Sequence, residues 1–245
     1  YEIDVSHVGS EMCIRDRHNI DADTPVIGVN SHPIEDYPNG SFGFYMDSDV
    51  HTFGEDIVTA LKGEAIINEI PRLQAIIDTT SGNRFTTDPA MNDLLIANTH
   101  QYAPSKYHLR RDGKKCRQQS SGIVFSTWLG QGAWLNHILE EETLEKLRNK
   151  VDYAEIDSHY FVVSREVSHA QRDENPWSWF DWTDQDTVLT SDMHRGYVVP
   201  DGWDEVHFNR GASITVNLEA PKLCLLTFRK PITEKLSELI KSKSV

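Results

Sequence analysis

Two groups of residues in this chain have the types and spacing to bind a nucleotide. One is the adjacent pair Asn92 and Asp93, directly before an apolar segment, and the other is Ser126 and Thr127, directly before a glycine-containing loop. An amide beside a carboxylate can hydrogen-bond ribose hydroxyls and the edge of a base. A strand that ends in Ser-Thr and runs into a glycine loop places backbone N–H groups where a phosphate or a ribose can approach closely. Either group alone is more typical of an ordinary turn beside a strand, so only their combination favours binding.

Neighbouring residues extend the candidate set. Trp134 follows the glycine loop and could stack on a ligand, although a Trp at a loop-to-helix junction is more often part of a core. Phe44 could pack against an adenine and is as easily a core residue. Asp201 is interpreted mainly as turn chemistry, because Gly202 follows it. The full candidate set is Phe44, Asn92, Asp93, Ser121, Ser126, Thr127, Gly130, Gly132, Ala133 and Trp134.

Short strands are the elements that must position most of these residues. Residues 106–110 alternate polar and apolar side chains and end at the turn pair Asp112 and Gly113, and residues 121–127 form an apolar, buried-type strand. From residue 72 onward, repeated strands and turn pairs predict a β-sandwich or a similar all-β unit.

Other segments predict a strand and three helices. Residues 24–30 are rich in Val and Ile and predict a buried strand. Residues 56–62 have helical spacing and end at a glycine that suits a C-cap. Residues 135–150 predict a helix with an acidic start and a basic end, which complements the helix dipole. Residues 233–241 predict a last amphipathic helix.

The order of the motifs is more specific than any one of them. An Asn-Asp pair, a strand pair ending in Asp-Gly, and Ser-Gly leading to Ser-Thr-x-x-Gly-x-x-Ala-aromatic together resemble the NAD kinase family. In that family the last motif reads Ser-Thr-Pro-Thr-Gly-Ser-Thr-Ala-Tyr. The positions that keep this frame are Ser126, Thr127, Gly130, Ala133 and Trp134. The positions that depart from it are Trp128, which replaces Pro, and Leu129, Gln131 and Gly132, which replace hydroxyl residues.

The resemblance covers residues 18–229 and implies a fold that is α/β plus mainly β. A remnant of a Rossmann-like α/β N-terminal domain would span residues 18–70, and a β-sandwich-like, NAD-binding domain would span residues 71–230. A C-terminal helix and tail, residues 231–245, would follow.

The resemblance also implies roles for the candidate residues. Asn92 and Asp93 would hold the ribose hydroxyls and adenine edge of NAD, and the loop of residues 126–132 would hold nucleotide. Ser121 stands where many members carry an acid that recognises the nicotinamide side, and its Ser-Ser-Gly context resembles the eukaryotic-organelle branch and some bacterial branches. Asn68 and Glu69 also look like the family's Asn-acid pair. In the family this pair comes after a strand, whereas Asn68 and Glu69 come before the corresponding predicted strand, so we interpret them as a decoy.

The family's reaction moves the terminal phosphoryl group of ATP, or of polyphosphate, onto the 2′-hydroxyl of the adenosine ribose of NAD, with Mg²⁺ bridging phosphate oxygens. Its base is the Asp of a Gly-Gly-Asp-Gly-Thr motif, and no Gly-Gly-Asp-Gly occurs in the 245 residues. Residues 1–17 resemble a translated sequencing adapter, so we expect a foreign leader and a missing native start. We therefore assign no catalytic residue and expect a truncated, inactive NAD kinase.

Two other functions stay open. A non-catalytic NAD(P)-sensing or assembly domain is favoured by the loss of hydroxyls at Leu129 and Gln131 and disfavoured by the retained Asn-Asp pair. A lipid kinase of the same superfamily would share the sandwich, but the motif order follows the NAD kinases more closely.

Two further clusters have simpler interpretations. His159, Glu166 and His169 lack the shared-face spacing that metal ligands on one element need, so we predict no metal site there. The aromatic segment 177–182 holds three Trp residues. It either closes one end of the sandwich or presents a face to a partner.

Composition limits the class of protein. The net charge is −14, of which the leader supplies −2 (four acids against two arginines), and this acidity argues against non-specific nucleic-acid binding. No apolar run is long enough to cross a membrane. Outside the leader only Cys116 and Cys224 remain, too few for a disulfide framework. We expect a protein of a reducing compartment, the cytoplasm or a eukaryotic organelle, and a homodimer paired through sheet edges.

Overall fold

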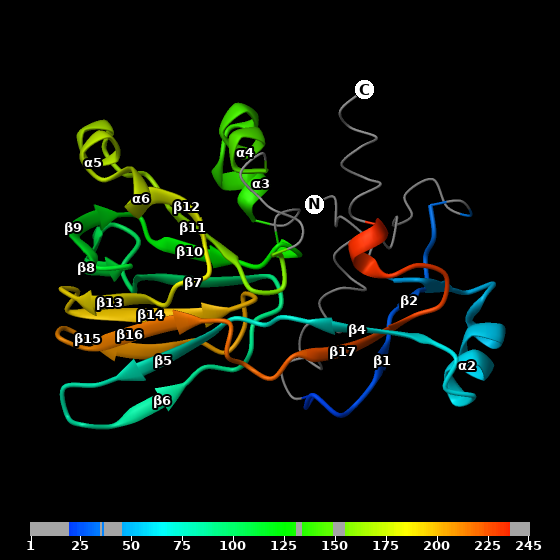
Figure 1. The fold of residues 1–245 in the computed structure, drawn as a ribbon. Coiled ribbons are helices and arrows are strands. Elements are labelled where there is room, and N and C mark those ends of the chain that lie inside the picture. The colour runs from blue at the N-terminus through cyan, green and yellow to red at the C-terminus, as the bar shows by residue number, and fades with distance from the viewer. Residues whose placement is uncertain (1–19, 35, 37–45, 131–133, 149–154, 236–245) are drawn as a thin grey trace. The chain divides into compact units, whose positions relative to one another are not determined.

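A computed structural model describes residues 20–34, 36, 46–130, 134–148 and 155–235. The chain divides into two compact units (Figure 1). The first combines residues 1–70 with residues 221–245, and the second spans residues 71–220.

Two six-stranded antiparallel sheets build the second unit. The first sheet has the order β12-β11-β10-β7-β14-β15, with the bounds Phe180–Thr183, Tyr160–Ser164, Ile123–Ser126, Asp93–Asn98, Arg195–Pro200 and Val206–Asn209. The second has the order β6-β5-β16-β13-β8-β9, with the bounds Arg84–Thr86, Gln74–Asp78, Ser213–Asn217, Thr187–Ser191, Ser105–Arg111 and Lys114–Ser120.

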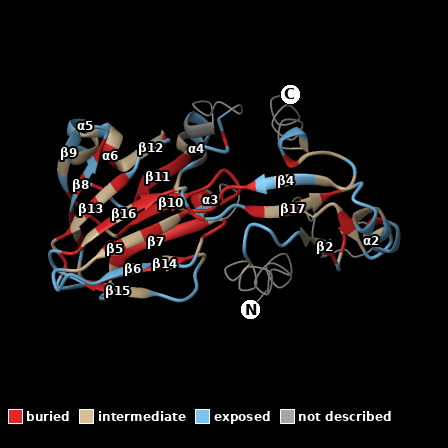
Figure 2. Cartoon of the chain, turned by 60° about the horizontal axis from the view of Figure 1, so that its bottom comes forward, coloured by how far each residue is buried: buried red, intermediate tan, exposed pale blue. Residues whose placement is uncertain are grey.

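Alternation along the strands builds the core between the two sheets. On β7, Leu94 and Ile96 belong to the main core, whereas Leu95 and Ala97 belong to a second cluster on the opposite face. Figure 2 shows buried residues concentrated along the strands of this unit. Successive side chains of a strand point to opposite faces, so one face of each sheet contributes to the shared core. Two sheets around one core confirm the predicted β-sandwich-like domain.

Short helices cover the outer face of the β7 sheet. Helix α3 (Leu135–Ile138) packs Leu135 and Ile138 against that second cluster, and α4 (Glu141–Arg148) follows it. The single helix predicted for residues 135–150 is therefore wrong, since the backbone is extended at Leu139. Helices α5 (His169–Glu174) and α6 (Pro176–Trp179) lead into β12.

The first unit is a small α/β assembly. Its three-stranded sheet pairs β1 (Val26–Ile27) parallel to β17 (Leu223–Thr227), and β17 antiparallel to β4 (Ile66–Ile70). Strand β2 (Val29–Asn30) runs parallel to β3 (Ser48–Asp49). Parallel pairing beside a helix confirms the α/β character expected of this part. Strand β17 falls within residues 71–230, the range predicted for the β-rich domain, but its ladder partners β1 and β4 lie in the first unit.

Helix α2 (Phe53–Leu61) begins and ends at local signals. The Asp49 carboxylate accepts the N–H groups of His51 and Thr52 just before the helix, and Gly63 follows the helix with a φ of 74°. The predicted helix at 56–62 thus exists and starts three residues earlier. A glycine in the left-handed region satisfies the last carbonyls without steric cost.

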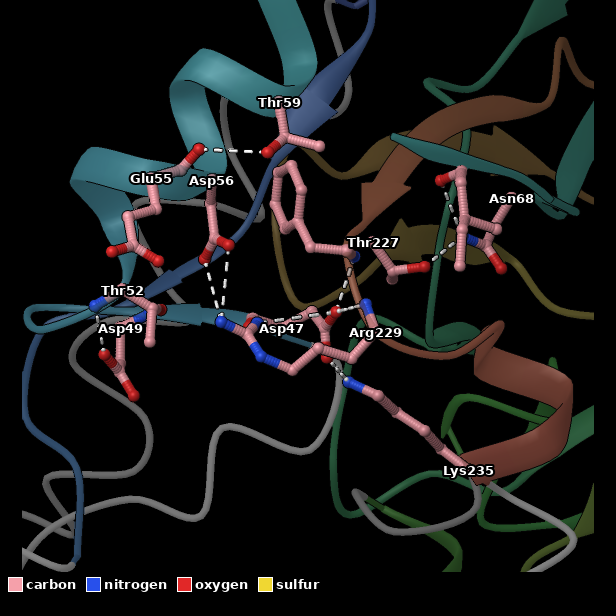
Figure 3. A network of polar contacts seen from close by, with 12 residues as sticks. Asp47, Asp49, Thr52, Glu55, Asp56, Thr59, Asn68, Thr227, Arg229 and Lys235 are labelled. Carbon is pink, nitrogen blue, oxygen red and sulfur yellow. Dashed lines mark hydrogen bonds and ion pairs between the residues drawn. The ribbon is translucent and has the colours of Figure 1, made fainter. Parts of the chain in front are cut away.

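A carboxylate ties the returning C-terminal strand to the first unit (Figure 3). Asp47, 4% exposed at its side chain, accepts the N–H groups of Phe228 (2.5 Å) and Arg229 (2.7 Å) and is hydrogen-bonded by Lys235. Burial raises the pKa of Asp47, but these donors outweigh it, and the pKa is lowered overall. Arg229 extends the network to Asp56 at 3.3 Å.

Residues 232–235 start a helix, and the rest of the helix predicted for 233–241 lies outside the described residues. No helix in the described parts of the chain has the length and apolar content to cross a bilayer.

Candidate functional site

The two predicted nucleotide-binding motifs meet at one end of the β7–β10 pair. Asp93, the first residue of β7, pairs directly with Ser126, the last residue of β10. Both residues lie on the face that carries Leu95 and Val124, because side chains alternate along a strand. The structure therefore brings together motifs that are distant in sequence.

Backbone and hydroxyl groups after β10 hold the segment before β7. The N–H of Thr127 donates to the Asn92 carbonyl at 3.0 Å, and its hydroxyl donates to the Met91 carbonyl at 2.5 Å. The Ser126 hydroxyl also donates to the Asn92 carbonyl, at 3.1 Å. Ser126 and Thr127 are fully buried. Their hydroxyls position the Asn-Asp pair in this structure.

Gly130 is required by close packing. A Cβ atom at this position would lie 2.4 Å from both the Asn92 carbonyl oxygen and the Ser126 hydroxyl oxygen. Any side chain would therefore displace the backbone that carries the Asn-Asp pair. The glycine of the motif fixes geometry here through the absence of a Cβ.

Asp93 has the most perturbed carboxyl group of the site. Its side chain is buried, and its Oδ1 atom has no hydrogen-bond partner among the described residues. Burial raises the pKa of Asp93 to about 7, and the charge of Asp201 adds to this rise. Hydrogen bonds from the Ser126 hydroxyl and from the backbone N–H of Trp134 act to lower it. Asn92 beside it is half-buried. Oδ1 is itself enclosed by the protein, so it is a buried polar atom that the described residues leave unsatisfied.

Asp201 makes contacts that its interpretation as a turn residue did not foresee. Its carboxylate accepts the N–H groups of Met91, Asn92 and Asp93 at 2.8, 2.8 and 2.9 Å. Its own N–H donates to the Asp93 carbonyl at 2.7 Å. The Asp-Gly pair marks a turn in the sequence, but nothing local indicates the partner segment.

Ser121 and Trp134 lie just before β10 and α3, respectively. Ser121 precedes β10 at the end opposite Ser126, and its hydroxyl donates to Glu166. Trp134 is 37% exposed, and the Arg165 guanidinium lies 5.6 Å from its ring centroid. Ser121 is therefore separated from Asp93 by the length of the strand, while Trp134 caps α3 near the Asn-Asp pair. Three candidate residues lie outside the described residues: Phe44, Gly132 and Ala133.

Two departures from the family motif have a packing explanation. Trp128 and Leu129, which replace Pro and a hydroxyl residue, are both almost fully buried. Their side chains add apolar contacts to the loop instead of facing outward. Their burial stabilises the loop without the hydroxyl that the family pattern carries there.

The decoy pair has a structural role in the first unit. The Asn68 side chain donates to the Leu225 carbonyl (3.2 Å) and to the Thr227 hydroxyl (2.9 Å), and it accepts the Ile232 N–H (3.0 Å). Its hydrogen-bonding groups are thus used to hold β4, β17 and the chain after β17 (Figure 3).

The Trp cluster, formed by Trp177, Trp179 and Trp182, is half-buried, and each of its rings contacts a cationic or aromatic side chain. Trp177 packs at the core beneath the Arg111 guanidinium (5.4 Å), and Arg172 lies over Trp179 (4.5 Å). Trp182 stacks on His159 (5.5 Å between centroids). Within the described ranges, no three His, Cys, Asp or Glu side chains are grouped to hold a metal ion.

Comparison with solved structures identifies the fold. A yeast NADH kinase in complex with NADH superposes with a TM-score of 0.63 at 14% identity, covering 82% of this chain and 56% of the yeast chain. An NAD kinase from Archaeoglobus fulgidus in complex with ATP superposes with a TM-score of 0.65 at 14% identity, covering 96% of this chain and 80% of that chain. This chain thus spans little more than half of the yeast enzyme.

No protein-family profile and no curated protein matches the chain in sequence. The likeness therefore lies in the fold, in which an α/β unit accompanies a β-sandwich, and by this measure the chain has an NAD kinase-like fold.

Proposed function

We propose that this chain is an NAD kinase-like protein that binds NAD through Asn92 and Asp93. The observation that carries the proposal is the pairing of Asp93 with Ser126, which sets the Asn-Asp pair beside the Ser126–Gly130 loop. The likeness to enzymes crystallised with NADH and ATP supports a nucleotide as the ligand.

The residues present suit a dinucleotide. The carboxyl group of Asp93 is of a type that accepts a ribose hydroxyl, and the half-buried amide of Asn92 can bond the adenine edge. Gly130 lets the loop pack closely against the Asn92 carbonyl and the Ser126 hydroxyl, which keeps the loop beside the Asn-Asp pair. Trp134 is exposed enough to contact an aromatic base, and the nearby Arg165 adds a positive charge suited to phosphate.

The reaction proposed for the full-length parent is transfer of the terminal phosphoryl group of ATP, or of polyphosphate, to the 2′-hydroxyl of the adenosine ribose of NAD. Mg²⁺ would neutralise phosphate charge when bound. In this chain Asn92 and Asp93 orient the ribose. The 245 residues hold no Gly-Gly-Asp-Gly motif, so we expect the chain itself to bind NAD and to turn it over little.

Calorimetric titration with NAD tests the binding proposal. Replacing Asn92 and Asp93 together by Ala should lower the NAD affinity by about tenfold or more, because two hydrogen-bonding groups are lost. A matched control is the exposed pair Asp184 and Gln185, also replaced by Ala. Equal affinities of the wild type and the Asn92/Asp93 variant would refute the assignment.

A non-catalytic NAD(P)-sensing or assembly role is the second candidate. It is favoured by the buried Leu129, which stands where the family pattern has a hydroxyl residue. An assay of NADP formation with ATP and Mg²⁺, and with polyphosphate and Mg²⁺, distinguishes the two roles. It should be run on the 245-residue chain and on the full-length gene product. NAD binding without NADP formation by the full-length product would favour the sensing role.

A further inference from the structure

We propose that Asp201 is a positioning residue that presents Asn92 and Asp93 to the ligand. The proposal rests on the proposed function, since it assumes that this pair binds NAD. It gives a ligand-related role to a residue more than a hundred positions away in the sequence.

The segment of residues 91–93 is held from two sides. On one side its N–H groups point to Asp201, whose Oδ2 accepts from Met91 and whose Oδ1 accepts from Asn92 and Asp93. On the other side the Met91 and Asn92 carbonyls accept from Ser126 and Thr127, at and just after the end of β10. The peptide groups of the Asn-Asp pair are therefore fixed in orientation by partners outside the pair.

A carboxylate is suited to this position because of where the ladder ends. The β7–β14 ladder ends at the pair Leu94 and Pro200, and residues 91–93 lie beyond this last rung. Asp201, the next residue, donates its N–H to the Asp93 carbonyl and folds its side chain onto the three N–H groups. An ionised carboxylate only accepts, and its two oxygens serve three donors, which an amide side chain cannot do without setting a donor against a donor.

The turn geometry supports this use of Asp201. Its φ is 47°, and Gly202 follows with a φ of 75°. Asp is among the few side chains that tolerate the left-handed region, and there its short carboxylate can reach nearby backbone N–H groups. Asp204 in the same loop also has a positive φ (46°) and is exposed, so it provides a matched control.

The charge of Asp201 reaches the ligand-binding carboxyl itself. Asp201 is the charged group that acts on Asp93, while the other groups acting on it, the Ser126 hydroxyl and the Trp134 N–H, are neutral. Removing the charge of Asp201 should therefore ease ionisation of Asp93. Simple loss of fold stability would not produce this change.

The experiment compares Asp201→Asn with Asp204→Asn in the full chain. NAD affinity should fall about tenfold in Asp201→Asn, further in Asp201→Ala, and should stay at the wild-type value in Asp204→Asn. Titration of the Asp93 carboxyl, followed by ¹³C NMR, should show a lower midpoint in Asp201→Asn alone. Wild-type NAD affinity together with an unchanged Asp93 midpoint in Asp201→Asn would overturn the proposal.

Two further readouts separate this proposal from the proposed function. If the wild-type chain bound no NAD, the proposed function would fail, while the Asp93 midpoint would still test the coupling to Asp201. If Asp201→Asn did not fold, hydrogen-bond scalar couplings in the wild type would decide. They should join the amide nitrogens of residues 91–93 to the Asp201 carboxyl carbon, and their absence would overturn the proposal.

Discussion

Asp93 and Ser126 are direct partners in the antiparallel pair of β7 and β10. The sheet itself therefore joins the two halves of the candidate site. A one-residue slip in this register would turn the side chain of Asp93 toward the core between the sheets. The site thus depends on the packing of the sandwich as much as on its polar residues.

Gly130→Ala should disturb both stability and binding. The new methyl group would overlap the Asn92 carbonyl and the Ser126 hydroxyl, each 2.4 Å away. We expect a loss of about 1–3 kcal/mol in the free energy of unfolding, which is typical of overpacking, and a weaker affinity for NAD. Urea unfolding and calorimetric titration measure the two effects.

Gly54→Ala is the matched control for that substitution. A Cβ at Gly54 in α2 meets no atom within 4 Å, so Ala should be neutral or slightly stabilising. If Gly130→Ala behaved like Gly54→Ala, the close packing against the Asn-Asp pair would be disproved.

Asp93→Asn should remove a pH dependence of stability. Burial raises the pKa of Asp93 from 3.8 to about 7, so between these values the folded chain holds a proton that the unfolded chain releases. The free energy of unfolding then falls as the pH rises through this window, by up to about 1.4 kcal/mol per pH unit. Asparagine stays neutral and should lack this slope, whereas exposed Asp88→Asn should keep it. Parallel pH profiles for the wild type and Asp93→Asn would contradict the raised pKa.

Asp47→Asn should loosen the C-terminal strand of the first unit. It weakens the acceptor of the Phe228 and Arg229 N–H groups and removes the partner of Lys235, so we expect a loss of about 2 kcal/mol or more. Because the folded pKa lies below 3.8, this stabilisation is present above that pH and is lost as the pH falls through the folded value. Faster hydrogen exchange in β17 would report the change.

The exposed residue Asp23 gives the like-for-like control, Asp23→Asn. Exchange in β17 should not change in this control. An equal response of the two variants would show that Asp47 does not anchor the strand.

Local signals explain how much of the sandwich could be predicted. Asp112 and Gly113 take φ values of 49° and 68° and join β8 to β9, as the turn pair indicates. The alternation in residues 106–110 places Tyr107 and Leu109 in the core. Turn residues and the alternation of polar and apolar side chains involve only neighbouring positions, so they can be recognised from the sequence alone.

Long-range partnerships account for what could not be predicted. Strand β17 looks like any apolar strand, and only its pairing with β1 and β4 assigns it to the first unit. Asp201 looks like a turn residue, and its partners lie 108 to 110 residues earlier. Trp128 and Leu129 looked like changes in a ligand contact, but they are packing residues. The ligand-binding role of Asn92 and Asp93 itself stays a prediction.

Arg111→Met should show whether the Trp cluster closes the sandwich. The Arg111 side chain is 3% exposed, donates to the Trp177 carbonyl (2.5 Å) and to Asp181 (2.8 Å), and lies over the Trp177 ring. Removing one partner of a buried ion pair typically costs about 3–5 kcal/mol, because the other charge stays buried without compensation. The Asp181 side chain is 31% exposed and can be solvated, so we expect a loss at the lower end of that range.

Arg110→Met, at the exposed neighbouring position, should change stability little. Thermal unfolding followed by Trp fluorescence checks both variants, since Trp177 reports directly on the contact. Equal unfolding temperatures would mean that the cluster does not depend on Arg111 for its place in the fold. A face available to a partner would then become the better interpretation. A large loss in Arg111→Met alone would instead make these Trp residues part of the closure of the sandwich.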